Sequence, residues 1–253
     1  MIIDKPMLSD IPALRDLWQE AFGDSDAFLD LFFSTAFDIE RSRCVTVDGA
    51  IAAALYWFDC SYEEKRIAYV YAVATAKAYR GRGFCSALME DVHHHAASLG
   101  YDGVILVPGS SELFRFYEKL GYTTCGYVSE FNCSASVVKA ELRQLDADEY
   151  AKLRRVFLPK DGVVQENENI KFLQTQATFY TGDGFLLAAR CEKDTLYGVE
   201  LLGDTKAAPF IVRALGCVEG RFRVPGTDKP FAMYRALSEG TLSPPAYFGW
   251  AFD

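Results

Sequence analysis

Apolar residues in the first part of the chain recur with two different spacings. An apolar residue every three or four positions behind Asp10 predicts an amphipathic helix, and a similar stretch follows it. The spacing then shortens to that of strands, and Asp48-Gly49 joins two β-rich runs as a strong hairpin signal. The expected elements are helices over 11–22 and 25–37, and strands over 43–47, 50–59 and 66–75.

A basic, glycine-containing loop at 77–83 interrupts this pattern, and helical spacing resumes after it. Gly100 and Gly121 stop two further helices. The expected elements are helices over 84–99 and 112–120, and strands over 103–107 and 122–131, the last of which closes the unit. Strands and helices in this order predict the α/β class, with a mixed sheet flanked by helices.

The remaining part of the chain repeats the same order in reduced form. A helix is expected over 146–157, a hairpin around Lys193-Asp194, a helix over 205–215, and closing strands over 218–224, 230–237 and 246–252. The sequence therefore predicts two domains, residues 1–131 and a smaller, related α+β domain over residues 132–253. The second half has no counterpart of the loop at 77–83.

Composition and charge narrow the possible partners. The chain has 253 residues, half of them apolar, and its longest apolar run, Ala50 to Phe58, is far shorter than the ~20 residues of a membrane span. No secretory signal is readable at the N-terminus, so a cytoplasmic protein without a membrane partner is expected. The net charge is −9, and residues 1–130 hold 19 acidic against 11 basic residues, which disfavours a nucleic-acid partner.

Cysteine and histidine residues do not form a metal-binding pattern. The seven cysteines include no Cys-x-x-Cys pair, so neither a structural zinc site nor a disulfide framework is expected. His93, His94 and His95 point about 100° apart on a helix and cannot converge on one ion. We expect them on the helix surface, with His95 in its buried stripe, and no metal cofactor.

The loop that follows the strand over 66–75 carries the most informative chemistry. Gly81 and Gly83 lead directly into a helix whose first amides lack intrahelical partners, which makes an anion site. Arg80 and Arg82 add donors suited to phosphate oxygens. The glycine spacing is equally compatible with an ordinary start of a helix that contains two glycines and exposed arginines and has no binding role. The loop lacks the Gly-Lys-Ser/Thr of a Walker motif and is no dinucleotide fingerprint.

Two segments together resemble the GCN5-related N-acetyltransferases (GNAT). Arg80-Gly-Arg-Gly-Phe-Cys85 fits the family's Gln/Arg-x-x-Gly-x-Gly/Ala except at the last position, and Glu112-Leu-Phe-Arg-Phe-Tyr-Glu-Lys-Leu-Gly-Tyr122 is similar to its later helix. The resemblance covers residues 1 to about 131 and implies the GNAT acyl-CoA fold, with acetyl-CoA as co-substrate. It implies that the amides of Val73 and Thr75 meet the pantetheine and the acetyl carbonyl. The pyrophosphate would lie on the amides from Gly81 to Ser86, that is Gly81, Arg82, Gly83, Phe84, Cys85 and Ser86.

Cys85 replaces the usual Gly or Ala of the family. A cysteine at a helix N-terminus can have a lowered pKa and react as a nucleophile. A structural role is favoured, because these enzymes transfer the acyl group directly to the amine.

The resemblance also assigns catalytic roles. Tyr117 matches the family's general acid, since a phenol with a pKa near ~10 can protonate a thiolate leaving group. From the residues alone Tyr117 reads as core, because it shares an apolar helix face with Leu113 and Leu120. The base is open: Tyr71 stands where many relatives carry a glutamate, and Glu63 or Glu64 through water is one alternative.

The chain's last residues offer another base. Relatives of the Eis type carry a Val-Ala-Thr-like phrase before the loop, as here at 73–75, and a degenerate second domain. They use their own C-terminal carboxylate, which here belongs to Asp253. A closing strand with a frayed end is the alternative for this segment.

The sequence therefore predicts an acetyl-CoA-dependent N-acetyltransferase acting on a small-molecule or peptide amine. Residues 1–64 hold 13 acidic against 4 basic residues, which favours a cationic acceptor, although surface solubility explains the same count. A non-catalytic acyl-CoA sensor is the main alternative, and a nucleotide-binding module a third. The oligomeric state stays open, a homodimer included.

Overall fold

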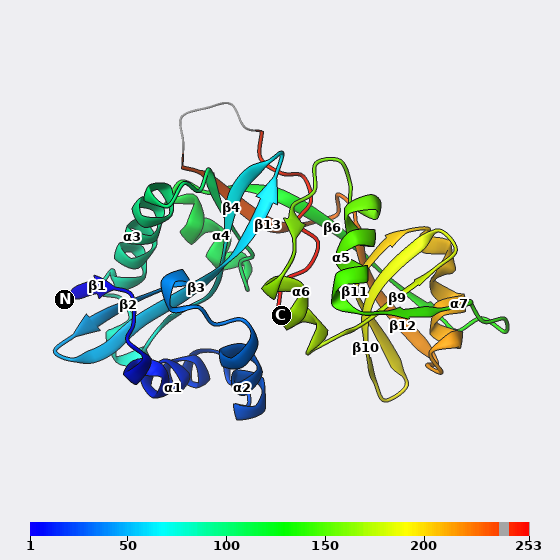
Figure 1. The fold of residues 1–253 in the computed structure, drawn as a ribbon, viewed down its shortest axis with the longest axis horizontal. Helices are drawn as coiled ribbons and strands as arrows, with labels where there is room; N and C mark the ends of the chain where they lie inside the picture. The colour runs from blue at the N-terminus through cyan, green and yellow to red at the C-terminus, as the bar shows by residue number, and fades with distance from the viewer. Residues whose placement is uncertain (238–242, 253) are drawn as a thin grey trace. The chain divides into compact units, whose positions relative to one another are not determined.

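The computed structural model describes residues 1–237 and 243–252. Contacts within the chain define two compact units (Figure 1). Unit 1 comprises residues 1–123 and 233–244, and unit 2 comprises residues 124–232 and 245–253. No helix of the described residues has the length and apolar content needed to cross a membrane.

Unit 1 contains most of the elements that the sequence predicts before residue 123. In chain order these are β1 Ile2–Asp4, α1 Ile11–Phe22, α2 Asp26–Thr35, β2 Ser42–Val47, β3 Ala50–Tyr62, β4 Lys65–Thr75, α3 Phe84–Ser98, β5 Gly103–Leu106 and α4 Ser111–Glu118. Short 3-10 turns lie at Leu8–Asp10, Ile39–Arg41 and Lys77–Tyr79. The predicted hairpin is confirmed, since Asp48 and Gly49 both have positive φ between β2 and β3.

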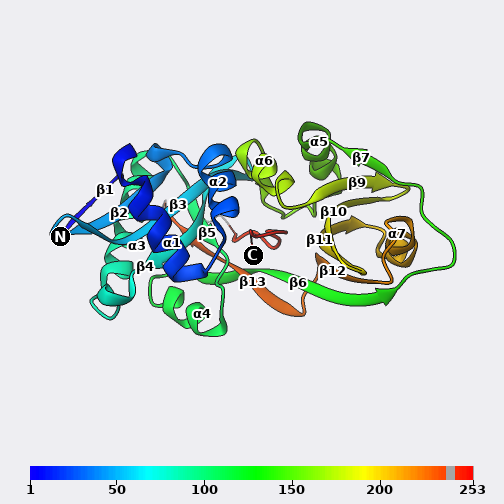
Figure 2. The ribbon, with the colours of Figure 1, turned by 90° about the horizontal axis from the view of Figure 1, so that it is seen from below.

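The sheet of unit 1 runs in the order β1-β2-β3-β4-β5, with β4 and β5 parallel and the other pairs antiparallel. The position beyond β5 is filled by the end of β13 (Lys229–Ala236), where Met233–Ala236 pair antiparallel with Gly103–Leu106. α3 packs on one face and α1 with α2 on the other (Figures 1 and 2). This arrangement confirms the predicted mixed sheet flanked by helices.

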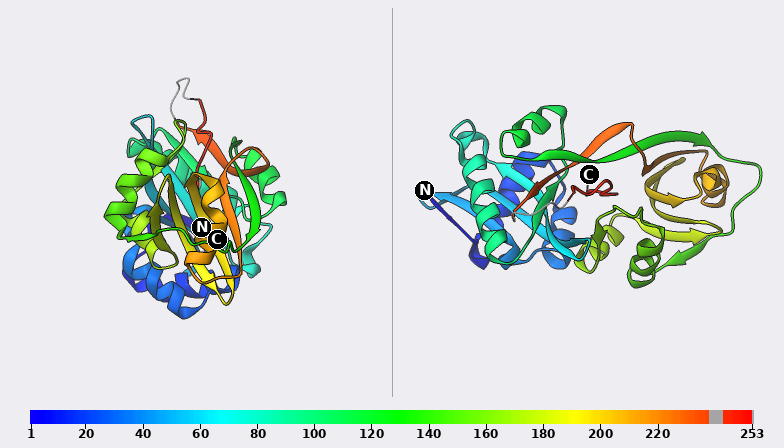
Figure 3. Two further views of the ribbon diagram at one scale, coloured as in Figure 1. Left: turned by 90° about the vertical axis from the view of Figure 1, so that its right-hand side faces the viewer. Right: turned by 90° about the horizontal axis from the view of Figure 1, so that it is seen from above.

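Unit 2 repeats this strand order. Its elements are β6 Thr123–Ser134, β7 Arg143–Leu145, α5 Ala147–Phe157, β8 Val164–Gln165, α6 Glu168–Gln174, β9 Thr178–Gly182, β10 Phe185–Glu192, β11 Thr195–Gly203, a 3-10 turn at Thr205–Ala207, α7 Ala208–Ala214, β12 Glu219–Pro225 and the first half of β13. The sheet runs β7-β9-β10-β11-β12-β6, with only β11 and β12 parallel among these pairs. α7 packs against one face of this sheet (Figure 3).

The two units differ from the predicted order in their last strands. The strand expected over 122–131 forms, as β6, but it pairs with β12 in unit 2 and does not close the sheet of unit 1. The closing position in unit 1 goes to β13, from near the end of the chain. Sequence patterns show which segments are strands, whereas the choice of neighbour depends on contacts far apart in the sequence.

The prediction of a strand over 246–252 is wrong. This segment makes only an isolated bridge, between Gly162 and Tyr247, and is otherwise irregular. Its aromatic residues are nevertheless buried within unit 2, with Phe248 and Trp250 fully enclosed. Arg154 holds the segment, donating to the carbonyl of Phe248 at 3.3 Å, and Tyr247 donates to Glu200 at 3.0 Å. Side-chain hydrogen bonds and a few backbone bonds, such as that from Val163 to the carbonyl of Tyr247 at 2.8 Å, hold the segment without a regular strand.

Candidate active site

β4 separates from its neighbour β5 near the middle of unit 1. β4 pairs with β3 as far as Thr75, but it pairs with β5 only over Ile67–Tyr69. Residues 70–75 therefore have an edge without a partner strand among the described residues. An unpaired edge presents backbone donors and acceptors to a ligand, as a sheet edge does to an added strand.

A bulge in β4 increases the number of backbone groups on this edge. Tyr71 pairs with Tyr56 and Ala74 with Ala54, so two residues, Ala72 and Val73, stand opposite one. Ala72 has φ +51°, a left-handed conformation that a non-glycine residue adopts only at a cost. The extra residue of a bulge is left unpaired, so the register gives neither Ala72 nor Val73 a partner residue in β3.

The amide of Thr75 also faces the open edge. The amide of the next residue, Ala76, donates to Ala52 of β3 at 2.9 Å, and successive residues of a strand point their backbone groups to opposite sides. The carbonyl of Thr75 accepts a hydrogen bond from Arg80 Nε at 3.1 Å, on the side away from β3. Val73 and Thr75 both lie in the part of β4 that has no pairing with β5, and their contacts with a cofactor stay a prediction.

The glycine loop presents a row of unused amides. Gly81 and Gly83 have φ of +75° and +80°, and the first helical hydrogen bond of α3 runs from Ala87 to the carbonyl of Gly83 at 3.0 Å. The amides of residues 81–86 find no acceptor in the part of the chain that the structure describes. Consecutive free amides at the N-terminus of a 15-residue helix form an anion-binding site.

Side chains fix the loop on both sides. Arg80 bonds to Thr75 as described, and the amide of Lys77 donates to Glu20 Oε2 of α1 at 2.9 Å. The guanidinium of Arg82 lies 5.4 Å from the ring centroid of Tyr79, whose ring lies 6.0 Å from that of Phe84. Both arginines therefore lie on the loop, as the sequence predicts.

Cys85 is partly buried in the first turn of α3. Burial raises the pKa of its thiol to about 11, so the thiol is protonated near neutral pH. Burial therefore acts in the opposite direction to the lowered pKa that a helix N-terminus can give. Cys85 behaves as a small packing residue, which agrees with the structural role favoured above.

Tyr117 lies on α4 with 5% of its surface exposed. Its ring packs edge-on against Tyr122, with centroids 5.7 Å apart, and belongs to the core beneath α3. Burial, with a smaller contribution from nearby Cys85, raises the pKa of the phenol above its usual range. Its hydroxyl forms no hydrogen bond with a described residue. The hydroxyl oxygen is also not fully enclosed by the protein. The residue is thus both core and the carrier of an available hydroxyl beside the first turn of α3.

His93 is buried and not on the helix surface as expected. Only 2% of it is exposed, and its Nε2 lies 2.8 Å from the hydroxyl of Tyr122. Arg235 of β13 donates to its Nδ1 at 2.6 Å, which leaves the proton on Nε2. Burial, and then the charge of Arg235, lower the pKa of His93 to about 4. His93 lies at helical spacing from the buried Met89 and Ala96, whereas its contact with Arg235 comes from a distant segment that no local pattern reveals.

The candidate bases fare differently. The ring of Tyr71 packs against those of Trp18, Phe58 and Phe32, with centroids 5.5 to 6.0 Å apart. Tyr71 is thus part of an aromatic cluster and supplies no carboxylate. Glu63 and Glu64 lie in the turn before β4, whose 11 residues at about 3.3 Å each place them roughly 30 Å from Thr75. That distance removes both as bases. Asp253 lies outside the described residues.

One carboxylate that sequence reasoning missed does lie at the open end of β4. Glu20 of α1 accepts from the amide of Lys77, two residues beyond Thr75. Asp16 stands one helical turn before it, and neither forms an ion pair with a described residue. Both positions are on the polar face of a helix that the sequence predicts, but only the structure brings Glu20 to the loop.

Comparison with known proteins is consistent with this geometry. Residues 3–125 match the sequence profile of a family described as acetyltransferase (GNAT) domain. No curated protein matches the sequence. Among solved structures, the GCN5-related N-acetyltransferase from Anabaena variabilis has a TM-score of 0.75 at 15% identity, covering 94% of this chain and 73% of that chain.

Two further solved structures have the same fold. The GCN5-related N-acetyltransferase from Kribbella flavida has a TM-score of 0.72 at 16% identity, covering 93% of this chain and 70% of that one. Eis1 from Mycobacterium abscessus has a TM-score of 0.70 at 11% identity, covering 94% and 74%. All three similarities extend over both units.

Proposed function

Residues 3–125 belong to the GNAT acetyltransferase family, and we propose that the chain transfers an acetyl group from acetyl-CoA directly to a primary amine. The observation that supports this proposal is that three features lie together in unit 1: an open strand edge, a glycine loop with free amides, and a tyrosine beside that loop. The second half of the chain serves in this proposal as a degenerate copy without a CoA site of its own. We place the protein in the cytoplasm, where acetyl-CoA is available.

The loop binds the pyrophosphate of CoA in this proposal. The amides of residues 81–86 supply donors, and Arg80 and Arg82 supply charge. The pantetheine then pairs with the open edge of β4 as an added strand would, at Val73 and Thr75.

Chemistry follows from this placement. The neutral amine attacks the thioester carbonyl, and the amide of Val73 or Thr75 stabilises the oxyanion that forms. When the intermediate collapses, the C–S bond breaks and Tyr117 donates its proton to the departing thiolate. The raised pKa of Tyr117 keeps the phenol protonated until that step. The tyrosinate regains a proton from solvent, and the amine has lost its own proton to water.

The acceptor in this proposal is a cationic small molecule or peptide. Many carboxylates of residues 1–64 are already paired, for example Asp26 and Asp30 with Arg15. Glu20 forms no ion pair with a described residue and lies beside Lys77, where it can meet an ammonium group at the open end of β4.

Replacement of one hydroxyl tests the proposal. Tyr117→Phe should lower kcat for CoA release about 100-fold or more, with the Kd for acetyl-CoA within about twofold of wild type. Tyr101→Phe, which deletes another buried hydroxyl of unit 1, should leave kcat within about threefold. Equal turnover in both variants would contradict the role of Tyr117.

A non-catalytic acyl-CoA sensor is the second candidate, favoured by the tyrosine at position 71 in place of an acid. It predicts acetyl-CoA binding with no CoA release on any amine. The wild-type protein therefore separates the two functions before any variant is made.

A further inference from the structure

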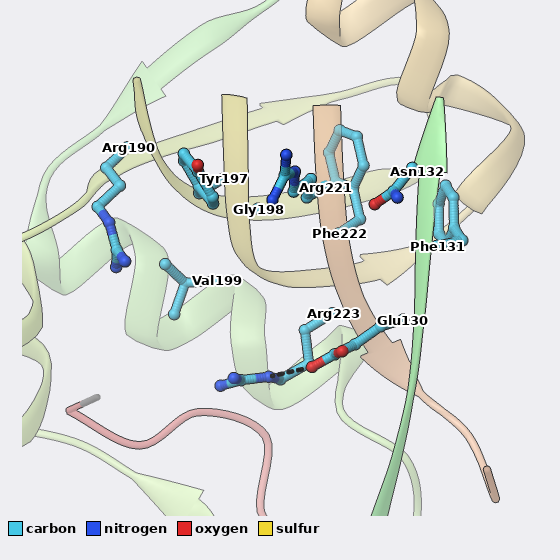
Figure 4. A pocket seen from close by; sticks show the side chains of 10 residues that line it. All are labelled: Glu130, Phe131, Asn132, Arg190, Tyr197, Gly198, Val199, Arg221, Phe222 and Arg223. Carbon is cyan, nitrogen blue, oxygen red and sulfur yellow. Dashed lines mark ion pairs between the residues drawn. The ribbon is translucent and has the colours of Figure 1, made fainter. Parts of the chain in front are cut away.

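One face of the unit 2 sheet gathers arginine side chains around a tyrosine. Arg190 on β10, Tyr197 on β11, Arg221 on β12 and Asn132 on β6 stand directly opposite one another in four neighbouring strands. Arg223 follows two residues along β12 and so points to the same face. These side chains line a hollow of about 350 Å³ (Figure 4).

The core on the opposite face of the sheet fixes this orientation. Phe222, between the two arginines of β12, is buried in the core beneath α7. A Cβ on Gly198 or Gly220 would come within 2.4 or 2.6 Å of its ring, so the two glycines make room for the ring. Because strand residues alternate between faces, burial of Phe222 commits Arg221 and Arg223 to the hollow.

Two of the arginines flank the tyrosine. The guanidinium carbons of Arg190 and Arg221 lie 5.5 and 5.7 Å from the ring centroid of Tyr197, approaching from the strands on either side (Figure 4). Their carboxylate partners are Glu192 at 3.0 Å and Glu219 at 3.4 Å, each two residues away on the same strand. These pairs are exposed, and exposed pairs contribute little, so both guanidiniums stay available to a ligand anion.

Arg223 supplies the third cation at the other end of the hollow. Its side chain is only 18% exposed, and its guanidinium carbon lies 4.7 Å from the ring centroid of Phe231. Glu130, which lines the hollow, lies 3.7 Å from Arg223 and also accepts a hydrogen bond from Lys229. That bond to Lys229, with the charge of Arg223, holds the pKa of Glu130 below its usual range. The one carboxylate in the lining is therefore already neutralised by two cations.

We propose that this hollow binds a small phosphorylated molecule. A guanidinium pairs with a phosphate through two parallel hydrogen bonds, and Arg190 with Arg221 match the two charges of a phosphate monoester. The amide of Asn132 lies in the same row and can bond to a hydroxyl of the ligand. A volume of about 350 Å³ suits a ligand at the small end of those that proteins bind in pockets.

The experiment uses the full chain and calorimetric titration with inorganic pyrophosphate, with and without saturating CoA. The double variant Arg190→Gln/Arg221→Gln removes the two flanking guanidiniums. Arg213→Gln on α7 is the control for the loss of an arginine at an exposed position of unit 2 that does not line the hollow. We expect binding that persists with CoA, weakens at least about tenfold in the double variant, and changes less than about twofold in the control.

Each other outcome overturns the proposal. Binding that CoA abolishes and the double variant retains assigns the anion to the glycine loop of unit 1. Equal losses of affinity in the double variant and in Arg213→Gln mean that the hollow is not the binding site. Citrate binding as tight as pyrophosphate binding refutes the preference for phosphate. Circular dichroism shows whether the double variant is folded. If it is unfolded, Arg221→Lys takes its place. This variant retains the charge without the planar guanidinium, so it should lose part of the affinity.

Discussion

Gly83 offers the sharpest test of the glycine loop, because its backbone conformation and its surroundings separate two effects. It has φ +80°, and no atom lies within 4 Å of the position a Cβ would take. Gly83→Ala therefore introduces strain without a clash inside the protein. A non-glycine residue in the left-handed region costs about 1 to 2 kcal/mol.

The strain should appear in CoA affinity. Without ligand the loop can relax, since the amides of residues 81–86 have no protein acceptors that hold them in place. Binding must then restore the left-handed conformation, and about 1 to 2 kcal/mol corresponds to a roughly 5- to 30-fold weaker Kd. Calorimetric titration of both proteins with CoA measures this change.

Gly49 provides the matched control. It has φ +82° in the turn between β2 and β3, also with nothing within 4 Å of a Cβ, and lies in the same unit. Gly49→Ala should lower the free energy of unfolding by about 1 kcal/mol in urea while leaving the Kd for CoA unchanged. If Gly83→Ala weakens CoA binding no more than Gly49→Ala does, the amides of the loop are not the phosphate site.

Three other changes have defined outcomes. In steady-state kinetics, Glu20→Gln should raise KM for a cationic amine severalfold at low salt and less at high salt. An effect on KM that is absent or independent of salt would contradict recognition by Glu20. The rate at which iodoacetamide alkylates Cys85, followed by mass spectrometry, should rise about tenfold per pH unit to beyond pH ~10, because burial raises the pKa of the thiol to about 11. A plateau of the rate near pH ~8 would refute the burial of Cys85. His93 has a pKa of about 4 when folded against about 6.5 when unfolded, so the unfolded chain binds the extra proton between these values. The free energy of unfolding should therefore fall as the pH drops from about 6.5 to about 4, and His93→Gln should show a smaller fall; equal slopes would contradict this assignment.

Local pattern predicted the elements of unit 1 closely, for physical reasons. The helix over 11–22 and the hairpin at Asp48-Gly49 depend on side-chain periodicity and on positive φ, both of which are written in neighbouring residues. The exchange of β6 and β13 between the two sheets was not predictable in this way. β13 reaches β5 through pairing of residues more than 100 positions apart, which no local period encodes.

The candidate site was predicted in part. The free amides of residues 81–86 and the place of Tyr117 follow from motif spacing together with the family resemblance. The burial of His93 and the raised pKa of Cys85 did not follow, because both depend on which side chains surround them. The arginine row of unit 2 needs the register of four strands, although the alternation Arg221-Phe222-Arg223 already indicates one polar face.

Titration of the wild-type protein with acetyl-CoA, followed in the same sample by an assay for free CoA thiol with a panel of amines, tests the central claim most directly. The account predicts micromolar binding and thiol release on at least one class of cationic amine. Failure of the wild-type protein to bind acetyl-CoA would contradict the assignment of residues 80–86 as its phosphate site.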